Sequence, residues 1–137
     1  MCDLTPKKFI FSTPPSVNSI YRRNSRGVFL SKEAKAWKNE MILRSKRFVG
    51  KGFGEIDIRV SMYYFPASSR DERVRDIDNL LKITLDTLQE MRCFDNDNQI
   101  CDLRIRRFHF SPPGCISIYI KPSREFPSIS HPNAGVL

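Results

Sequence analysis

The sequence predicts an α+β domain, a single mixed sheet of about four strands with two helices packed on one of its faces. Segments in which apolar and polar residues alternate indicate strands, and two segments with apolar residues at helical spacing separate them. The length of 137 residues fits one hydrophobic core. We therefore expect a single domain over residues 1–121 and a disordered tail over 122–137, where Pro, Ser, Asn and Gly dominate.

The best-defined strand is expected over Glu55–Phe65, where apolar and polar residues alternate along the whole segment. Its apolar set is Ile56, Ile58, Val60, Met62 and Tyr64. A shorter apolar run, Phe9–Ser12, predicts a first strand that stops before Pro14 and Pro15, because proline cannot donate to a sheet ladder. One face of the long strand is therefore expected in the core.

The last two strands are expected to be joined by a tight turn. In Ile100–Phe110 the inward-facing residues change phase, which predicts a bulge near Arg106 and Arg107. The residues that carry this phase are Leu103 and Ile105, then Phe108 and Phe110. Ser111–Gly114 predicts a hairpin turn into a last strand over Cys115–Lys121.

Two helices are expected. Ser31 is a typical N-cap residue, and apolar residues recur at helical spacing from it to about Phe48, where glycines within 50–54 end the helix. The second helix is expected from about Asp78 to Met91, and its buried side comprises Leu80, Leu81, Thr84, Leu88 and Met91. The polar, basic segment Ser16–Gly27 predicts a loop.

The composition favours a polyanionic partner and argues against several other classes of protein. Lys and Arg number 23 against 15 Asp and Glu, which gives a net charge of +8. No segment approaches the roughly 20 apolar residues that span a bilayer, and no signal peptide is evident, so we expect no membrane partner and a cytoplasmic location. The four cysteines form no C-x-x-C pair, which argues against zinc.

The stretch Arg75–Gln99 is an acidic island in this basic chain. If Asp76 is extended while Asp78 caps the second helix, their two carboxylates can converge on one point above the helix end. Hard oxygen ligands of this kind select Mg²⁺ or Mn²⁺, which polarises a phosphodiester and activates a water. Lys82, one turn into the helix, could orient that water or stabilise negative charge, and the turn after the helix carries Asp97.

The same residues have a simpler interpretation. An aspartate at a helix start complements the helix dipole, and Asp78, Lys82 and Asp86 follow one another at i,i+4 spacing. This spacing is typical of a surface ion-pair ladder. Because caps and such pairs are far commoner than active sites, spacing alone favours the ladder over a metal site.

Two basic segments are candidates for contacts with a nucleic-acid backbone. The loop after the first strand carries Arg22, Arg23 and Arg26. The polar face of the first helix carries Lys32, Lys35, Lys38 and Lys46. An ordinary solvated loop and a solvated helix face would look the same, so the sequence leaves both interpretations open.

Three motifs together resemble the RusA family of Holliday junction resolvases, which are dimeric endonucleases of bacteria and their prophages. The first two are Pro14-Pro15-Ser16-Val17-Asn18 and the segment Val28–Trp37 with its helix start at Ser31. The third is Arg75-Asp76-Ile77-Asp78-Asn79-Leu80-Leu81-Lys82, which continues through Asp86 to Asp95-Asn96-Asp97-Asn98-Gln99. The resemblance extends over nearly the whole chain up to Lys121.

The resemblance implies a RusA-like fold, a homodimer and magnesium-dependent cleavage of a DNA four-way junction by paired nicks, in recombination and repair. It places the metal-binding aspartates at Asp76, Asp78 and Asp97 and the important lysine at Lys82. Added to the basic residues above, it implies DNA contacts at Asn18, Arg75 and Asn79. The family often has two adjacent aspartates before the glutamine. Here the first of them is Asn96, which leaves Asp95 as a substitute or a bystander.

Helix length adds a geometric expectation that does not depend on the family. A helix from Asn79 to Met91 is about 20 Å long, so Asp97 should lie at the opposite end from Asp76 and Asp78. In a two-fold dimer with these helices antiparallel, Asp97 of one subunit would approach the helix start of the other. The alternatives are a module that binds branched DNA without cutting it, and a structural scaffold with a basic face.

Overall fold

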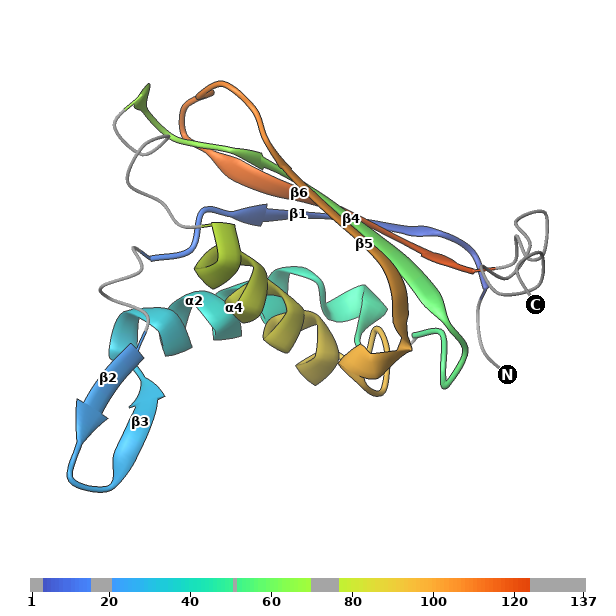
Figure 1. Cartoon of the computed structure of the whole chain (residues 1–137), viewed down its shortest axis with the longest axis horizontal. Helices are drawn as coiled ribbons and strands as arrows, with labels where there is room; N and C mark the ends of the chain where they lie inside the picture. The colour runs from blue at the N-terminus through green and yellow to red at the C-terminus, as the bar shows by residue number, and fades with distance from the viewer. Residues whose placement is uncertain (1–3, 16–20, 51, 70–76, 124–137) are drawn as a thin grey trace, which may run out of the picture.

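The computed structural model describes residues 4–15, 21–50, 52–69 and 77–123. Over these residues a four-stranded sheet is covered on one face by two helices (Figure 1), which confirms the α+β class. The expected tail lies outside the described residues from 124 onward. In the described part of the chain, no helix combines the length and the apolar character needed to cross a membrane.

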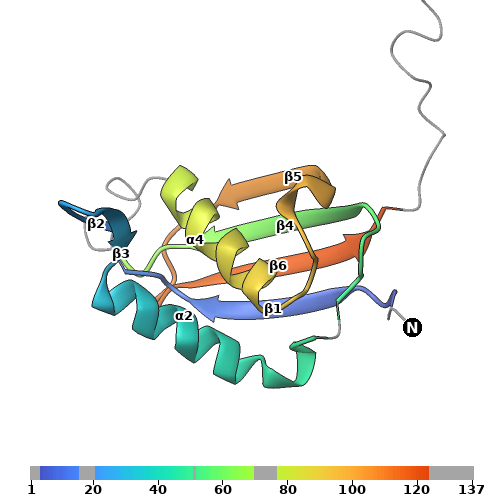
Figure 2. The same cartoon turned by 90° about the horizontal axis from the view of Figure 1, so that it is seen from below.

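The sheet contains β1 (Lys7–Ser12), β6 (Cys115–Pro122), β4 (Ile58–Phe65) and β5 (Ile100–Arg107), side by side in that order. Strand β6 is antiparallel to both β1 and β4, whereas β5 is parallel to β4, so the sheet is mixed as expected. A parallel pair needs a crossover, and helix α4 (Ile77–Glu90) supplies it between β4 and β5 (Figure 2).

The core lies between the sheet and the helices. Phe9 and Phe11 of β1 and alternate residues of β4 and β6 are buried there, in the phase that the alternation predicts. The residues of β4 and β6 are Ile58, Val60, Met62, Tyr64, Ile116, Ile118 and Ile120. Ile56, at the start of the predicted strand, precedes β4 and is 41% exposed.

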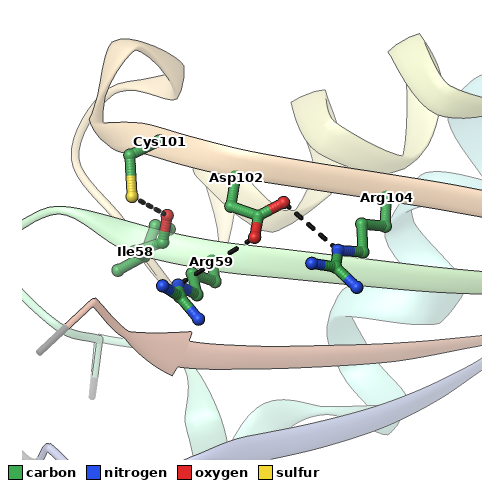
Figure 3. A network of polar contacts seen from close by, with 5 residues as sticks. All are labelled: Ile58, Arg59, Cys101, Asp102 and Arg104. Carbon is green, nitrogen blue, oxygen red and sulfur yellow. Dashed lines mark hydrogen bonds and ion pairs between the residues drawn. The ribbon is translucent and has the colours of Figure 1, made fainter. Parts of the chain in front are cut away.

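The bulge in the sheet lies at the opposite end of β5 from the predicted one. The register of β4 and β5 shifts between Ile58 and Arg59, where Cys101 is the extra residue and its thiol donates to the Ile58 carbonyl at 3.4 Å (Figure 3). The predicted bulge near Arg106 and Arg107 was wrong, because pairing with β4 continues in register to Arg107. The phase change in the sequence marks the end of the strand instead.

The connection from β5 to β6 also differs from the prediction. Strand β6 lies on the far side of β4, so Ser111–Gly114 is a turn within a crossover and the expected hairpin was wrong. The Ser111 amide donates to the Pro66 carbonyl at 2.8 Å, which fixes the crossover over the end of β4. Strand β5 is left as an edge, and this explains why Leu103 is 41% exposed although Ile105 is partly buried.

Helix α2 (Lys32–Arg44) begins where the sequence predicts. The Ser31 side chain caps it by accepting a hydrogen bond from the Ala34 amide at 3.1 Å. The helix buries Ala34, Trp37 and Met41. It ends at Arg44, earlier than predicted, and is followed by the 3₁₀ turn η1 (Lys46–Phe48). The glycines of 50–54 therefore do not end this helix.

Helix α4 buries more residues than the sequence predicts. Leu80, Thr84, Leu88 and Met91, the residue after its end, are buried as expected, while Leu81 is only partly buried. Ile83 and Thr87 are buried in addition. The two threonine hydroxyls satisfy their hydrogen bonding inside the helix, by donating to the carbonyls of Leu80 and Ile83 at 2.7 Å.

A small hairpin replaces part of the expected loop. Strands β2 (Tyr21–Asn24) and β3 (Gly27–Leu30) pair antiparallel as a separate two-stranded sheet. The Asn24 side chain accepts a hydrogen bond from the Arg26 amide at 2.8 Å, and Gly27 has φ 123°, so the turn uses the residues suited to it. Both strands are mostly exposed, which is why no alternating pattern marked them.

Candidate active site

Asp97 is displayed on a turn that one buried glutamine holds in place. The 3₁₀ turn η2 (Asp97–Gln99) follows α4 and leads into β5. The Gln99 side-chain oxygen accepts from the amides of Asp95 and Asn96 at 2.8 Å. Its amide group donates to the carbonyls of Gly54 and Ile56, at 2.6 and 2.7 Å. Gln99 is 7% exposed and fully engaged, while Asp97 faces solvent.

The Asn96 side chain stabilises the same turn. Its side chain accepts a hydrogen bond from the Asn98 amide at 3.0 Å and caps η2, and with Gln99 it completes a capping box. Asn96, where the resemblance described above implies an aspartate, therefore shapes the turn. Asp95 is exposed, and its backbone amide is bound by Gln99.

The segment 50–54 braces the end of α4 just before this turn. The Gly50 amide donates to the Met91 carbonyl at 3.0 Å. Gly52 lies so close to the backbone of Arg92 and Cys93 that a Cβ would overlap their carbonyl oxygens. Glycine is required there because only a residue without a side chain allows this approach. The glycines that the sequence suggested as the end of α2 thus stabilise the far end of α4.

At the other end of α4, the helix begins one residue earlier than predicted. Ile77 is its first residue, so Asp78 lies inside the first turn and is not the cap. The side chains of Asp78 and Asn79 lie outside what the structure describes, and so do Arg75 and Asp76.

Lys82 projects from α4 into solvent and contacts the hairpin. Its Nζ lies 4.9 Å from the centroid of the Tyr21 ring, a cation–π contact between α4 and β2. Tyr21 is itself partly buried against the core. Within the described part of the chain no ion pair joins Lys82 to Asp86. The Lys82–Asp86 step of the suggested ion-pair ladder is therefore not formed.

The two ends of α4 are far apart in one subunit. At about 1.5 Å per residue, a helix of 14 residues is about 21 Å long. The turn carrying Asp97 lies beyond the C-terminal end of α4, while the hairpin lies beside its start (Figures 1 and 2). Among the described residues, no three His, Cys, Asp or Glu side chains are grouped closely enough to hold a metal ion.

The basic candidates fall into two groups. Arg22, Arg23 and Arg26 are exposed on the β2–β3 hairpin, and Lys32 and Lys35 are exposed at the start of α2 next to it. Asn18 lies outside the described residues. Lys38 is different, because its ammonium pairs with Glu90 at 2.6 Å and ties α2 to α4.

Glu33 lies among these exposed cations. Hydrogen bonds from its own backbone amide and from Ser31 lower the pKa of its carboxyl, with Arg22 adding a smaller effect. An ionised carboxylate in the first turn of α2 supports the helix start.

Two important residues escaped the reasoning from sequence. Tyr21 was an unassigned residue of a loop, and nothing local links it to Lys82. Gln99 is part of the motif, but motif spacing does not show that its side chain holds the turn in place by hydrogen bonds. The pattern Asn96-x-x-Gln99 is a capping-box signature and could have indicated it.

The fold and this geometry define a class of protein: an α+β domain that presents a carboxylate and an ammonium group at opposite ends of one crossover helix. A family model described as endodeoxyribonuclease RusA matches residues 12–121. The chain therefore belongs to the RusA family.

Individual relatives agree with this assignment. The crossover junction endodeoxyribonuclease RusA of Enterobacteria phage HK97 is 27% identical over 113 residues, which cover 82% of this chain and 92% of that protein. Proteins of the same name from Enterobacteria phage 82 and Escherichia coli K12 are 28% identical over 110 and 113 residues. Both of these matches cover 78% of this chain and 87% of the relative.

Proposed function

We propose that this chain is a metal-dependent, structure-selective DNA endonuclease that resolves four-way junctions by paired symmetric nicks, in recombination and repair. The names of its relatives support the substrate class. The observation that carries the proposal is the turn at Asp97, where four hydrogen bonds to one buried side chain hold an exposed carboxylate in a fixed place. Hydrogen bonds that hold a ligand-bearing segment in a fixed place are typical of metal sites.

The chemistry of the donors fits a small divalent cation. Asp76, Asp78 and Asp97 offer carboxylate oxygens, which Mg²⁺ and Mn²⁺ prefer, and Asp97 is exposed and can reach a ligand without losing an existing contact. A bound ion of this kind polarises a phosphodiester and lowers the pKa of an attacking water. In this proposal Lys82 stabilises negative charge on the phosphate, and the hairpin arginines hold the DNA backbone.

A dimer with shared active sites reconciles these roles with the length of α4. If two copies place their α4 helices antiparallel about a two-fold axis, the Asp97 turn of each approaches the helix start of the other. Leu81 and Leu85 support this arrangement, because they are four residues apart on α4 and only partly buried in one subunit. Two equivalent sites related by a two-fold axis also suit paired nicks in strands of like polarity.

A cleavage assay on a labelled four-way junction tests the proposed activity. We expect cutting by the wild type only with Mg²⁺ or Mn²⁺, and loss of cutting with retained junction binding in Asp76→Asn and Asp78→Asn. Asp86→Asn is the matched control, because it neutralises an exposed carboxylate on the same helix and should still cut. Cutting that persists in both test variants would defeat the metal site. Binding without any cutting would favour a non-catalytic branched-DNA module.

Mixing inactive subunits tests the shared site. Asp78→Asn and Asp97→Asn subunits should restore one intact site in each mixed dimer, so random mixing should restore about a quarter of wild-type nicking. Because each mixed dimer has one intact site, the product should be nicked and not resolved. Asp76→Asn mixed with Asp78→Asn is the control, since both changes lie at the same helix end and leave no intact site. No recovery in the first mixture would contradict the shared site.

A further inference from the structure

The face of the sheet turned away from the helices is open to solvent and carries a row of aromatic rings. Tyr119 of β6 and Tyr63 of β4 have ring centroids 5.7 Å apart. Phe108, just after β5, lies 5.7 Å from Tyr63 and stacks on Phe65 at 5.0 Å. Tyr119 is 41% exposed, so its ring is accessible to a ligand. The row runs from β6 across β4 to the residue that follows β5, and it belongs neither to the core nor to the candidate active site.

Cations surround this aromatic row. The Lys8 ammonium lies 5.3 Å from the Tyr119 ring, and the Arg106 guanidinium lies 4.9 Å from the Phe108 ring. By strand register, the basic residues on this face are Lys8, Arg59, Arg104, Arg106 and Lys121. Among the described residues of these strands that share the face, Asp102 is the one carboxylate. Its oxygens lie 3.4 Å from Arg104 and 4.0 Å from Arg59 (Figure 3).

The rings and cations meet at a pocket. A cavity of about 310 Å³ lies at one end of the row, and its lining includes Lys8, Ser61, Tyr63, Tyr119 and Lys121. The lining therefore combines two tyrosines with basic residues of the open face. This is the chemistry that accepts a nucleobase and its neighbouring phosphate.

We propose that this open sheet face binds an unpaired DNA strand, with a base stacked on the exposed Tyr119 ring beside Tyr63, and phosphates beside Lys8 and Lys121. A duplex has no free base faces to offer, so the rings favour a single strand. A second copy of the chain is the poorer occupant, because a two-fold contact would place this basic face against itself. The choice of DNA rests on the proposed function, whereas the stacking surface does not.

This surface is separate from the candidate active site. Helix α4 and the turn after it lie on one side of the sheet (Figure 1). By strand register and burial, the aromatic row projects from the other side. A strand bound here would be held by the same subunit without occupying the cleavage site. The face therefore adds a second contact that recognises unpaired bases.

The test is fluorescence anisotropy with a labelled oligothymidylate, without Mg²⁺ and without a junction, so its outcome does not depend on whether the protein cuts DNA. We expect tighter binding to oligothymidylate than to an abasic strand of the same length and charge. Tyr119→Ala should weaken binding to the oligothymidylate by about tenfold and leave duplex binding unchanged. Tyr119→Phe, which keeps the ring, should bind like the wild type.

Phe29→Ala is the matched control for Tyr119→Ala. Phe29 is 43% exposed, nearly the same as Tyr119, but it lies on the β2–β3 hairpin. Its removal should leave oligothymidylate binding unchanged. The proposal is overturned if the abasic strand binds as tightly as the oligothymidylate, or if Tyr119→Ala binds the oligothymidylate like the wild type. It is also overturned if Phe29→Ala loses as much affinity for the oligothymidylate as Tyr119→Ala does. A dimer that Tyr119→Ala dissociates without any change in binding would assign the face to a second copy instead.

Discussion

The two ends of helix α4 are built in different ways, although the proposed function needs both. At the C-terminal end, Gln99 makes four hydrogen bonds within a buried environment, and the glycine segment 50–54 packs against the helix terminus. At the start of the helix, Lys82 contacts one ring, Tyr21, which belongs to a separate two-stranded hairpin. Asp97 is thus positioned by the core, and Lys82 by a peripheral element.

This difference separates two kinds of positioning. A turn clamped by buried hydrogen bonds keeps its geometry in a single subunit, because each lost bond leaves a polar group unpaired. A single cation–π contact at an exposed lysine is weaker, because water screens it. Loss of the Gln99 clamp should therefore affect folding and activity together, whereas loss of the Lys82–Tyr21 contact should act on activity.

The largest effect is expected from Asp97 itself. Asp97→Asn should lower the rate of junction cleavage by more than about a hundredfold, because it removes a proposed metal ligand. The melting temperature should stay within error of the wild type, since Asp97 is exposed. Asp95→Asn removes a neighbouring exposed carboxylate from the same turn and is the control. Equal losses in the two variants would show that charge alone, and not the position of Asp97, matters.

Removing the Gln99 side chain should lower both the stability of the fold and the cleavage rate. Gln99→Ala leaves the carbonyls of Gly54 and Ile56 without their donor, so it should lower the free energy of unfolding by about 2–4 kcal/mol in urea denaturation. Cleavage should fall by at least about tenfold at a temperature where the variant is folded, because the Asp97 carboxylate is no longer fixed. Gln89→Ala, at a half-buried glutamine of α4, is the control and should change neither by much. Full activity in folded Gln99→Ala would show that the turn needs no clamp.

The elements that the sequence predicted best are those with strong periodicity. Strands β4 and β6 and helix α4 each bury one regular face, so their alternation or helical spacing is visible in the chain. The β2–β3 hairpin buries little and left no such pattern. Strand order was also beyond local reasoning, because β6 pairs with β1 and β4 and not with its neighbour in sequence, β5.

The candidate site shows the same division. Asp97 and Lys82 could be chosen from motif spacing, because both lie in the one stretch that contains α4 and its turn. The residues that position Asp97 and Lys82 could not be chosen in this way. Gln99 bonds to carbonyls 45 and 43 residues away, and Tyr21 lies on a different element from Lys82. Contacts of this kind depend on how the elements pack, which residue spacing does not specify.

The start of α4 offers a smaller effect on the cleavage rate. Tyr21→Ala should lower the cleavage rate by about fivefold to tenfold, because Lys82 loses the ring that holds its ammonium group in place. Tyr21→Phe keeps the ring and should restore the rate. The control Phe29→Ala removes an exposed ring from the same hairpin and should leave cleavage unchanged. A rate that stays low in Tyr21→Phe would assign the effect to the hydroxyl and not to the cation–π contact.

The smallest effect concerns the buried thiol at the C-terminal end of α4. Burial raises the pKa of Cys93 from 9.0 to about 12, so the folded chain keeps the thiol neutral while the unfolded chain ionises first. Its contribution to stability is complete below pH 9 and is lost as pH rises through 12, by up to about 1.4 kcal/mol per pH unit. Urea denaturation at pH 8 to about 10.5 should show this slope, and Cys93→Ala should reduce it. Cys101→Ala, which removes an exposed thiol from β5, is the control. An unchanged slope in Cys93→Ala would mean that the end of α4 admits water at high pH, and that the clamped end is less rigid than its hydrogen bonds suggest.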